Sequence, residues 1–219
     1  NEVLKSLIDL KNIKGNNPSI KAMAYQLYEN NGVLKREQVF DYLKNLEQNE
    51  RKILRELGVK FGRYHVFLHQ LIKPEAVSLR TLLWKNFHQK FYNLKPPTFG
   101  LNFIDNKDLK NQNFMLLCGF EKFDAFFVRI DILERLFMLI INSNSKENKD
   151  IKVVPEMLNL LGCSKENFKK LLIKMNYKVF EKEKEIYFKY NPVKKFKKVS
   201  MKKVSKENPF EVLKNLNLR

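Results

Sequence analysis

The apolar positions of the first 58 residues recur at the spacing of amphipathic helices. The clearest series follows i, i+3, i+4, i+7 and i+8 and consists of Ile20, Met23, Ala24, Leu27 and Tyr28. Two shorter series predict further helices, one with Val39, Leu43 and Leu46 and one with Ile53, Leu54 and Leu57. Because glycine favours helix ends, Gly32 and Gly58 are expected to stop the first and the last of these helices.

The pattern changes between Val59 and Leu68, where β-branched and aromatic residues surround Gly62. This composition predicts one or two short extended segments. Pro74 suits the first turn of a new helix. The apolar side of that helix is expected to hold Leu79, Leu82, Leu83 and Trp84, with Trp84 in the core.

The second half shows a different order of elements. Residues 128–141 predict a long amphipathic helix, and residues 151–154 predict a short strand. Pro155 opens a helix that ends at Gly162, and Ser164 is the expected N-cap of the next helix. That helix carries its apolar residues at i, i+3, i+4 and i+7: Phe168, Leu171, Leu172 and Met175. Two strands, 177–181 and 186–190, follow around a charged tip. Helix, short strand, helix, tight turn, helix and hairpin is the order of a winged helix.

The predicted fold class is therefore mainly α with small β elements. Residues 1–95 are expected to form the N-terminal helical bundle with the extended motif. Residues 96–127, with Pro96-Pro97, Gly100 and several Asn, predict a linker or loop. Residues 128–192 are expected to form a winged-helix-like domain. Residues 193–219 are lysine-rich at first and predict a basic tail with a short C-terminal helix at 209–218.

The charge balance narrows the choice of partner. The chain has 42 Lys and Arg against 24 Asp and Glu, a formal net charge of +18. Such a surplus favours polyanions, either nucleic acid or an anionic membrane surface. An AT-rich coding sequence, which also enriches Lys, Asn and Ile, is the alternative explanation. No apolar run reaches the roughly 20 residues of a membrane span, and there is no signal peptide.

The two cysteines, Cys118 and Cys163, are far apart and have no His or Cys neighbour at metal-ligand spacing. We expect buried thiols, no metal site and a bacterial cytoplasmic location. No Ser/His/Asp or Cys/His set and no phosphate-binding glycine loop is apparent, so no catalytic site is expected within this chain. The chain begins with Asn1 and not with Met, which we interpret as the start of a fragment.

Two groups of residues are candidates for nucleic-acid contact. In a winged helix the third helix usually enters a groove while the hairpin touches the backbone. The first group therefore comprises Lys165, Lys169, Lys170, Lys174 and Lys184. These lysines would bind phosphates without sequence information. The alternative is that they form a solvated helix face.

The second group is Arg63, Tyr64 and His65. In the functional interpretation Arg63 binds a phosphate and an aromatic ring stacks on an unpaired base. In the alternative, this segment is a structural corner in which Arg63 pairs with a carboxylate and the rings pack.

Several blocks in order resemble the C-terminal part of alphaproteobacterial superfamily-two helicases related to the mitochondrial degradosome RNA helicase. The most specific block runs from Leu57 to Trp84, and it departs from the family at His69, where relatives usually have Pro. The other blocks are 4–10, 20–33, 128–136, 154–164 and 209–213. The resemblance implies that ATP- and Mg²⁺-binding motor domains precede residue 1. It also implies that this region guides RNA or DNA, or docks a protein partner such as a nuclease.

Two other functions stay open at this point. One is a free-standing winged-helix regulator that binds duplex DNA. The other is a protein-docking module that makes no contact with nucleic acid.

Overall fold

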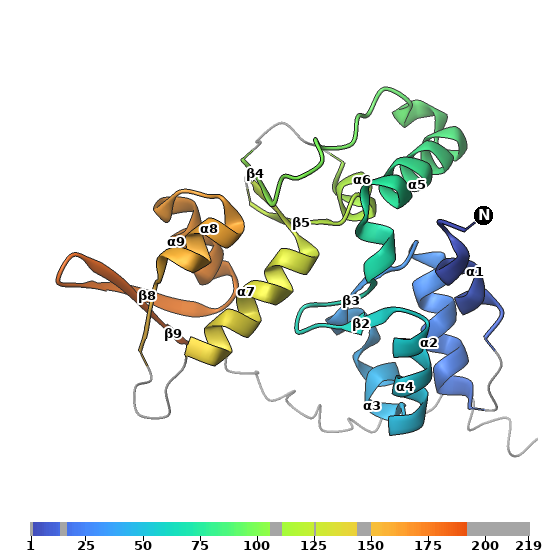
Figure 1. Cartoon of the computed structure of the whole chain (residues 1–219), viewed down its shortest axis with the longest axis horizontal. Helices are drawn as coiled ribbons and strands as arrows, with labels where there is room; N and C mark the ends of the chain where they lie inside the picture. The colour runs from blue at the N-terminus through green and yellow to red at the C-terminus, as the bar shows by residue number, and fades with distance from the viewer. Residues whose placement is uncertain (1, 14–16, 106–110, 125, 144–149, 192–219) are drawn as a thin grey trace, which may run out of the picture.

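The computed structural model describes residues 2–13, 17–105, 111–124, 126–143 and 150–191. Within them the chain is mixed α/β, mainly helical, with three small antiparallel sheets of three strands each (Figure 1). The predicted tail, residues 193–219, lies outside the described residues. No helix in the described ranges is both long enough and apolar enough to cross a membrane.

The first unit contains α2, the helix whose spacing was clearest in the sequence. The Asn17 side chain caps it by accepting the backbone N–H of Ser19 at 2.8 Å. Gly32, at φ +79°, lets the chain turn out of the helix, and a Cβ there would lie 2.4 Å from a Leu71 methyl group. The elements of this unit are α1 (Lys5–Lys11), α2 (Pro18–Glu29), β1 (Val33–Lys35), η1 (Arg36–Val39), α3 (Phe40–Asn45), α4 (Gln48–Glu56), β2 (Val59–Phe61) and β3 (His65–Leu68).

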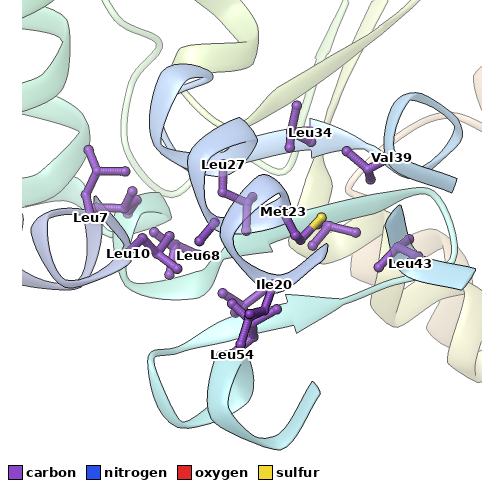
Figure 2. Close-up of a cluster of buried hydrophobic side chains, with 14 of the residues drawn as sticks. Leu7, Leu10, Ile20, Met23, Leu27, Leu34, Val39, Leu43, Leu54 and Leu68 are labelled. Atoms are coloured by element: carbon purple, nitrogen blue, oxygen red, sulfur yellow. The ribbon is translucent and has the colours of Figure 1, made fainter. Parts of the chain in front are cut away.

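The first unit is more than a helical bundle. Strand β3 lies between β1 and β2, with Leu34 opposite Val66 and Phe61 opposite Val66 on the other side. The two extended segments expected between Val59 and Leu68 are present, whereas β1 was not predicted. The helices and one face of this sheet enclose a common core (Figure 2), whose labelled members are Leu7, Leu10, Ile20, Met23, Leu27, Leu34, Val39, Leu43, Leu54 and Leu68.

The second unit contradicts two sequence predictions. Residues 96–127 are not simply a linker, because they contain two strands and a helix, with strand order β4-β6-β5. The apolar rings that build this sheet lie among Asn and Lys, which obscured the pattern; Phe103, for example, stacks on Phe126. The elements are η2 (His69–Ile72), α5 (Pro74–Phe87), η3 (Gln89–Phe91), β4 (Phe103–Asp105), α6 (Gln112–Leu117), β5 (Phe120–Phe123) and β6 (Phe126–Arg129).

The second contradiction concerns the orientation of α5. Leu82 and Leu83 are about half exposed, and Trp84 is only partly buried. The buried side instead carries Arg80, whose guanidinium donates hydrogen bonds to the carbonyl oxygens of Asn31 and Leu71. Burial lowers the pKa of Arg80 to about 10. The sequence pattern predicted leucines on the inner face of α5, but Arg80 lies there and its guanidinium satisfies two buried carbonyl groups.

The third unit follows the order of elements expected from the sequence. Gly162 closes α8 in the left-handed conformation, and the Ser164 hydroxyl accepts the backbone N–H of Asn167 at 3.2 Å. The long helix starts at Ile130 and not at residue 128, because residues 126–129 form β6. The elements are α7 (Ile130–Ser143), β7 (Ile151–Lys152), α8 (Pro155–Leu161), α9 (Lys165–Lys174), β8 (Tyr177–Lys182) and β9 (Glu185–Tyr190).

The first and third units share one topology. In both, a helix leads to a short strand, two further helices and a hairpin, and the last strand lies in the middle of the sheet. In both units the first strand pairs antiparallel with the central strand, with Leu34 opposite Val66 in one unit and Ile151 opposite Phe188 in the other. The chain therefore contains the same arrangement twice, joined by the β4-β6-β5 unit.

Candidate nucleic-acid interface

Helix α9 presents lysines along its solvent side. Its inner side is fixed by Phe168, Leu171 and Leu172, which are fully buried. Lys169 pairs with Glu181 of the hairpin, and Lys174 Nζ lies 3.0 Å from Asp124 Oδ2. Lys165 and Lys170 are exposed and make no ion pair with any described residue. Two of the four predicted helix lysines are thus locally compensated and two are available to an anion.

Lys184 lies at the tip of the hairpin between β8 and β9. It forms a two-residue turn with Glu183, and both residues have positive φ, as a tight hairpin of this type requires. The side chain is exposed. Because it is exposed at the tip of the hairpin, the Lys184 side chain can contact a phosphate.

The segment Arg63–His65 forms the corresponding turn of the first hairpin, and it is held by Glu134 of α7. The Glu134 carboxylate accepts the backbone N–H groups of Arg63, Tyr64 and His65, the last two at 2.8 and 2.9 Å. A Cβ on Gly62 would lie 2.2 Å from the carboxyl carbon of Glu134. The carboxylate thus binds the backbone of the turn and not the Arg63 guanidinium, which leaves that side chain exposed.

The Tyr64 ring is packed into the protein. It meets Phe137 of α7 edge-on with 5.8 Å between ring centroids. Burial, together with the neighbouring Tyr177, raises the pKa of the Tyr64 hydroxyl. The Tyr64 ring is thus partly buried and packs against α7.

His65 is buried in an ionic chain. Its Nε2 lies 3.2 Å from Glu121 Oε2 and its Nδ1 lies 3.7 Å from Glu134 Oε1. Lys35 Nζ lies 2.6 Å from the other oxygen of Glu121. Burial opposes protonation of the imidazole, but Glu121 and Glu134 outweigh it and raise the pKa of His65. The chain Lys35–Glu121–His65–Glu134 therefore connects β1, β5, β3 and α7.

The same corner borders a hollow that we call the basic groove. It has a volume of about 410 Å³ and is lined by four cations: Lys35, Arg36, Arg63 and Lys174. Its two carboxylates are Glu37 and Glu121, and Glu121 is already bound by Lys35 and His65. The exposed ring of Phe40 also lines it. Cations from both copies of the repeated topology thus converge on one concave surface.

A second hollow lies against α7 and shares Arg36 and Arg63 with the basic groove. Its volume is about 810 Å³, and it adds Lys60 and Arg135 to the cations. Both acidic residues in its wall are engaged: Asp131 with Arg129, and Glu134 with the turn at 63–65. Both negative charges of this wall are thus already bound within the protein, whereas its cations outnumber them.

The structure brings only some of the predicted residues together. Arg63, Tyr64, His65 and Lys174 all line the basic groove, although Lys174 is more than 100 residues away from the other three along the chain. The exposed lysines of α9 and Lys184 lie outside this set. Sequence reasoning missed Lys35 and Arg36, because their contribution depends on β1 pairing with β3, where Lys35 is opposite His65.

The described residues contain no group of three or more His, Cys, Asp or Glu side chains placed to hold a metal ion. Cys118 is buried and Cys163 is half-buried, and burial raises the pKa of both thiols, to about 12 and about 11. No family model, no curated protein and no solved structure matches this chain.

Proposed function

We propose that this chain is a nucleic-acid-binding region, built on two units of the winged-helix type, that serves as the C-terminal accessory part of an ATP-dependent helicase. The basic groove is the observation that carries the proposal. Four cations from separate elements surround the hollow; Lys35 is paired with Glu121 and Lys174 with Asp124, whereas Arg36 and Arg63 make no ion pair with a described residue. Concave surfaces of one charge attract a polyanion and raise its rate of association.

The repeated topology supports the winged-helix assignment. In a winged helix the third helix and the hairpin meet the nucleic acid. Here the third helix of the second copy, α9, exposes Lys165 and Lys170. The third helix of the first copy, α4, exposes Lys52 and Arg55. Each copy therefore offers cations on the element that this type of domain uses for binding.

The helicase assignment rests on the order of the sequence blocks that resemble that family. In this proposal the motor domains bind ATP and Mg²⁺ and precede residue 1. This region then holds or guides the strand that the motor moves. RNA and DNA are both compatible with the contacts available, because lysine and arginine bind phosphates of either.

Neutralising the groove tests the proposal. Arg63→Gln combined with Lys174→Gln removes two charges, and the Arg63 backbone keeps its hydrogen bond to Glu134. The matched control is Lys5→Gln with Lys21→Gln, which removes two exposed charges from α1 and α2. Binding to labelled oligouridine and to a DNA duplex is measured by fluorescence anisotropy, and thermal unfolding confirms that each variant is folded.

We expect the groove variant to bind about tenfold more weakly, with a salt dependence reduced by roughly 0.7 per lost phosphate contact on a single strand. The control should bind like the wild type. Equal affinities of the groove variant and the control would refute the groove as the binding surface. A complete lack of binding by the wild type would favour the protein-docking alternative, and tight sequence-specific duplex binding would favour the free-standing regulator.

A further inference from the structure

The two copies of the repeated topology differ in the outer face of their sheets, the face that points away from the helices of the same copy. In the first copy this face carries Val33, His65 and Phe67, all of which are buried. Val33 and Phe67 pack against Ile130, at the start of α7. The rest of the chain therefore covers this face with apolar contacts.

The corresponding face of the second copy is open within the described residues. Residues of β8 and β9 alternate, so that Tyr177 and Phe188 point into the core while their neighbours point outward. We call the outward set the outer sheet face; it consists of Lys152, Lys178, Phe180, Lys182, Tyr187 and Lys189, together with Glu185. All four lysines are exposed. This composition does not suit the apolar packing that covers the first copy.

Two rings lie at the centre of the outer sheet face. Phe180 and Tyr187 are directly opposite in the β8–β9 register and are nearly parallel, with 14° between ring planes and 6.2 Å between centroids. Lys182 Nζ lies 5.1 and 5.8 Å from the two centroids. Both rings keep part of their surface in solvent. They form an aromatic platform with the Lys182 ammonium over the rings, and Lys182 Nζ also lies 3.0 Å from Asp150 Oδ2.

The charges around the platform favour an anion. Lys178 and Lys189 are directly opposite each other in the register, and like charges at paired positions destabilise a sheet. Neither makes an ion pair with a described residue. Glu185 is engaged by Lys152 Nζ at 2.5 Å and by the Tyr187 hydroxyl at 3.2 Å. A bound phosphate between Lys178 and Lys189 would relieve their repulsion.

We propose that the outer sheet face binds single-stranded nucleic acid, with bases stacked on Phe180 and Tyr187 and phosphates bound by Lys178 and Lys189. The inference deepens the proposed function, since it presupposes that the chain binds nucleic acid, and adds a second surface and a strand preference. Stacking on exposed rings needs unpaired bases, which a duplex keeps inside its own stack. A purely acidic partner would use the lysines but not the parallel rings.

The experiment distinguishes base stacking on the rings from phosphate binding by the lysines. The platform variant is Phe180→Leu with Tyr187→Leu, which keeps apolar bulk and removes the π faces. The lysine variant is Lys178→Gln with Lys189→Gln. A matched aromatic control is Tyr25→Leu with Tyr42→Leu, two exposed rings of α2 and α3. The probes are labelled oligothymidine and an abasic strand of the same length and charge, and thermal unfolding verifies the fold of each variant.

The platform variant should bind oligothymidine at least about fivefold more weakly, as expected for losing one stacked base. Its affinity for the abasic strand should be unchanged. The lysine variant should lose affinity for both strands, and the aromatic control for neither.

The outcomes distinguish this inference from the function on which it rests. A platform variant that binds oligothymidine like the wild type would overturn the inference, and so would an equal loss on both strands. In either case a weakened groove variant, Arg63→Gln with Lys174→Gln, would leave the proposed function intact. No binding of any strand by the wild type would overturn both.

Discussion

The contact between Gly62 and Glu134 gives the sharpest prediction on stability. Replacing Gly62 with Ala places a Cβ 2.2 Å from the Glu134 carboxyl carbon and 2.5 and 2.6 Å from its oxygens. The carboxylate is the end of a flexible side chain, so it will rotate away and abandon the three N–H groups of the 63–65 turn. In Gly62→Ala the steric clash is therefore relieved only at the cost of three hydrogen bonds.

The size of the effect follows from those bonds. A hydrogen bond to a charged group contributes about 1.5–3 kcal/mol, and less where water replaces it. The Arg63 N–H is in an exposed residue, whereas His65 is buried. We therefore expect Gly62→Ala to lower the free energy of unfolding by about 2–4 kcal/mol, measured by urea denaturation followed by circular dichroism.

A double-mutant cycle decides whether Glu134 is the cause. Glu134→Ala alone should cost a similar amount, because it orphans the same three N–H groups. In that background Gly62→Ala should be neutral or should stabilise the fold by up to about 1 kcal/mol, because Gly62 does not have a positive φ and the Cβ no longer meets a carboxylate. Additive costs would refute the proposed clash and show that Gly62 is required for another reason.

Two further predictions concern His65 and Ser164. Because the folded protein raises the pKa of His65, its protonation stabilises the fold below about pH 6.5, and this contribution is lost as the pH rises through the folded pKa. His65→Gln should therefore flatten the decline in unfolding free energy above about pH 6.5; an unchanged slope would exclude His65 as the titrating group. Ser164→Ala should lower the free energy of unfolding by about 1 kcal/mol, and Ser164→Asp should restore it, because either oxygen-bearing side chain caps α9. Equal stability of the Ala variant would show that the cap contributes nothing.

Local signals in the sequence predicted much of the third unit. Gly162 and Ser164 mark the turn between α8 and α9 through their own backbone and side-chain preferences, so their roles follow from the residues alone. The same holds for the stop of α2 at Gly32. In these places the structure depends on neighbours within a few residues.

The failures have two causes, distant partners and strands too short to give a clear pattern. The apolar pattern put Leu82 and Leu83 inside, but the buried side of α5 is fixed by Arg80 and the carbonyl groups of Asn31 and Leu71. The 96–127 segment was predicted as a loop because its strands are only three or four residues long and contain acidic or basic residues beside the apolar ones.

The candidate site shows the same limit. Arg63 and Lys174 were each proposed from local composition, but nothing in their neighbourhoods indicated that they share one groove. That depends on Glu134 binding the 63–65 turn, an interaction that spans about 70 residues of sequence. Lys35 and Arg36 enter the groove only because β1 pairs with β3.

The dependence of nucleic-acid affinity on salt tests the central claim most directly. Arg36 and Arg63 are the groove cations that make no ion pair with a described residue. If each neutralises a phosphate of a single strand, raising the salt from about 50 to about 200 mM should weaken binding of oligouridine by about sevenfold, from a slope of roughly −0.7 per contact. Anisotropy titrations of the wild-type chain at several salt concentrations measure this slope. Absence of binding at the lowest salt, or an affinity that salt leaves unchanged, would contradict the account.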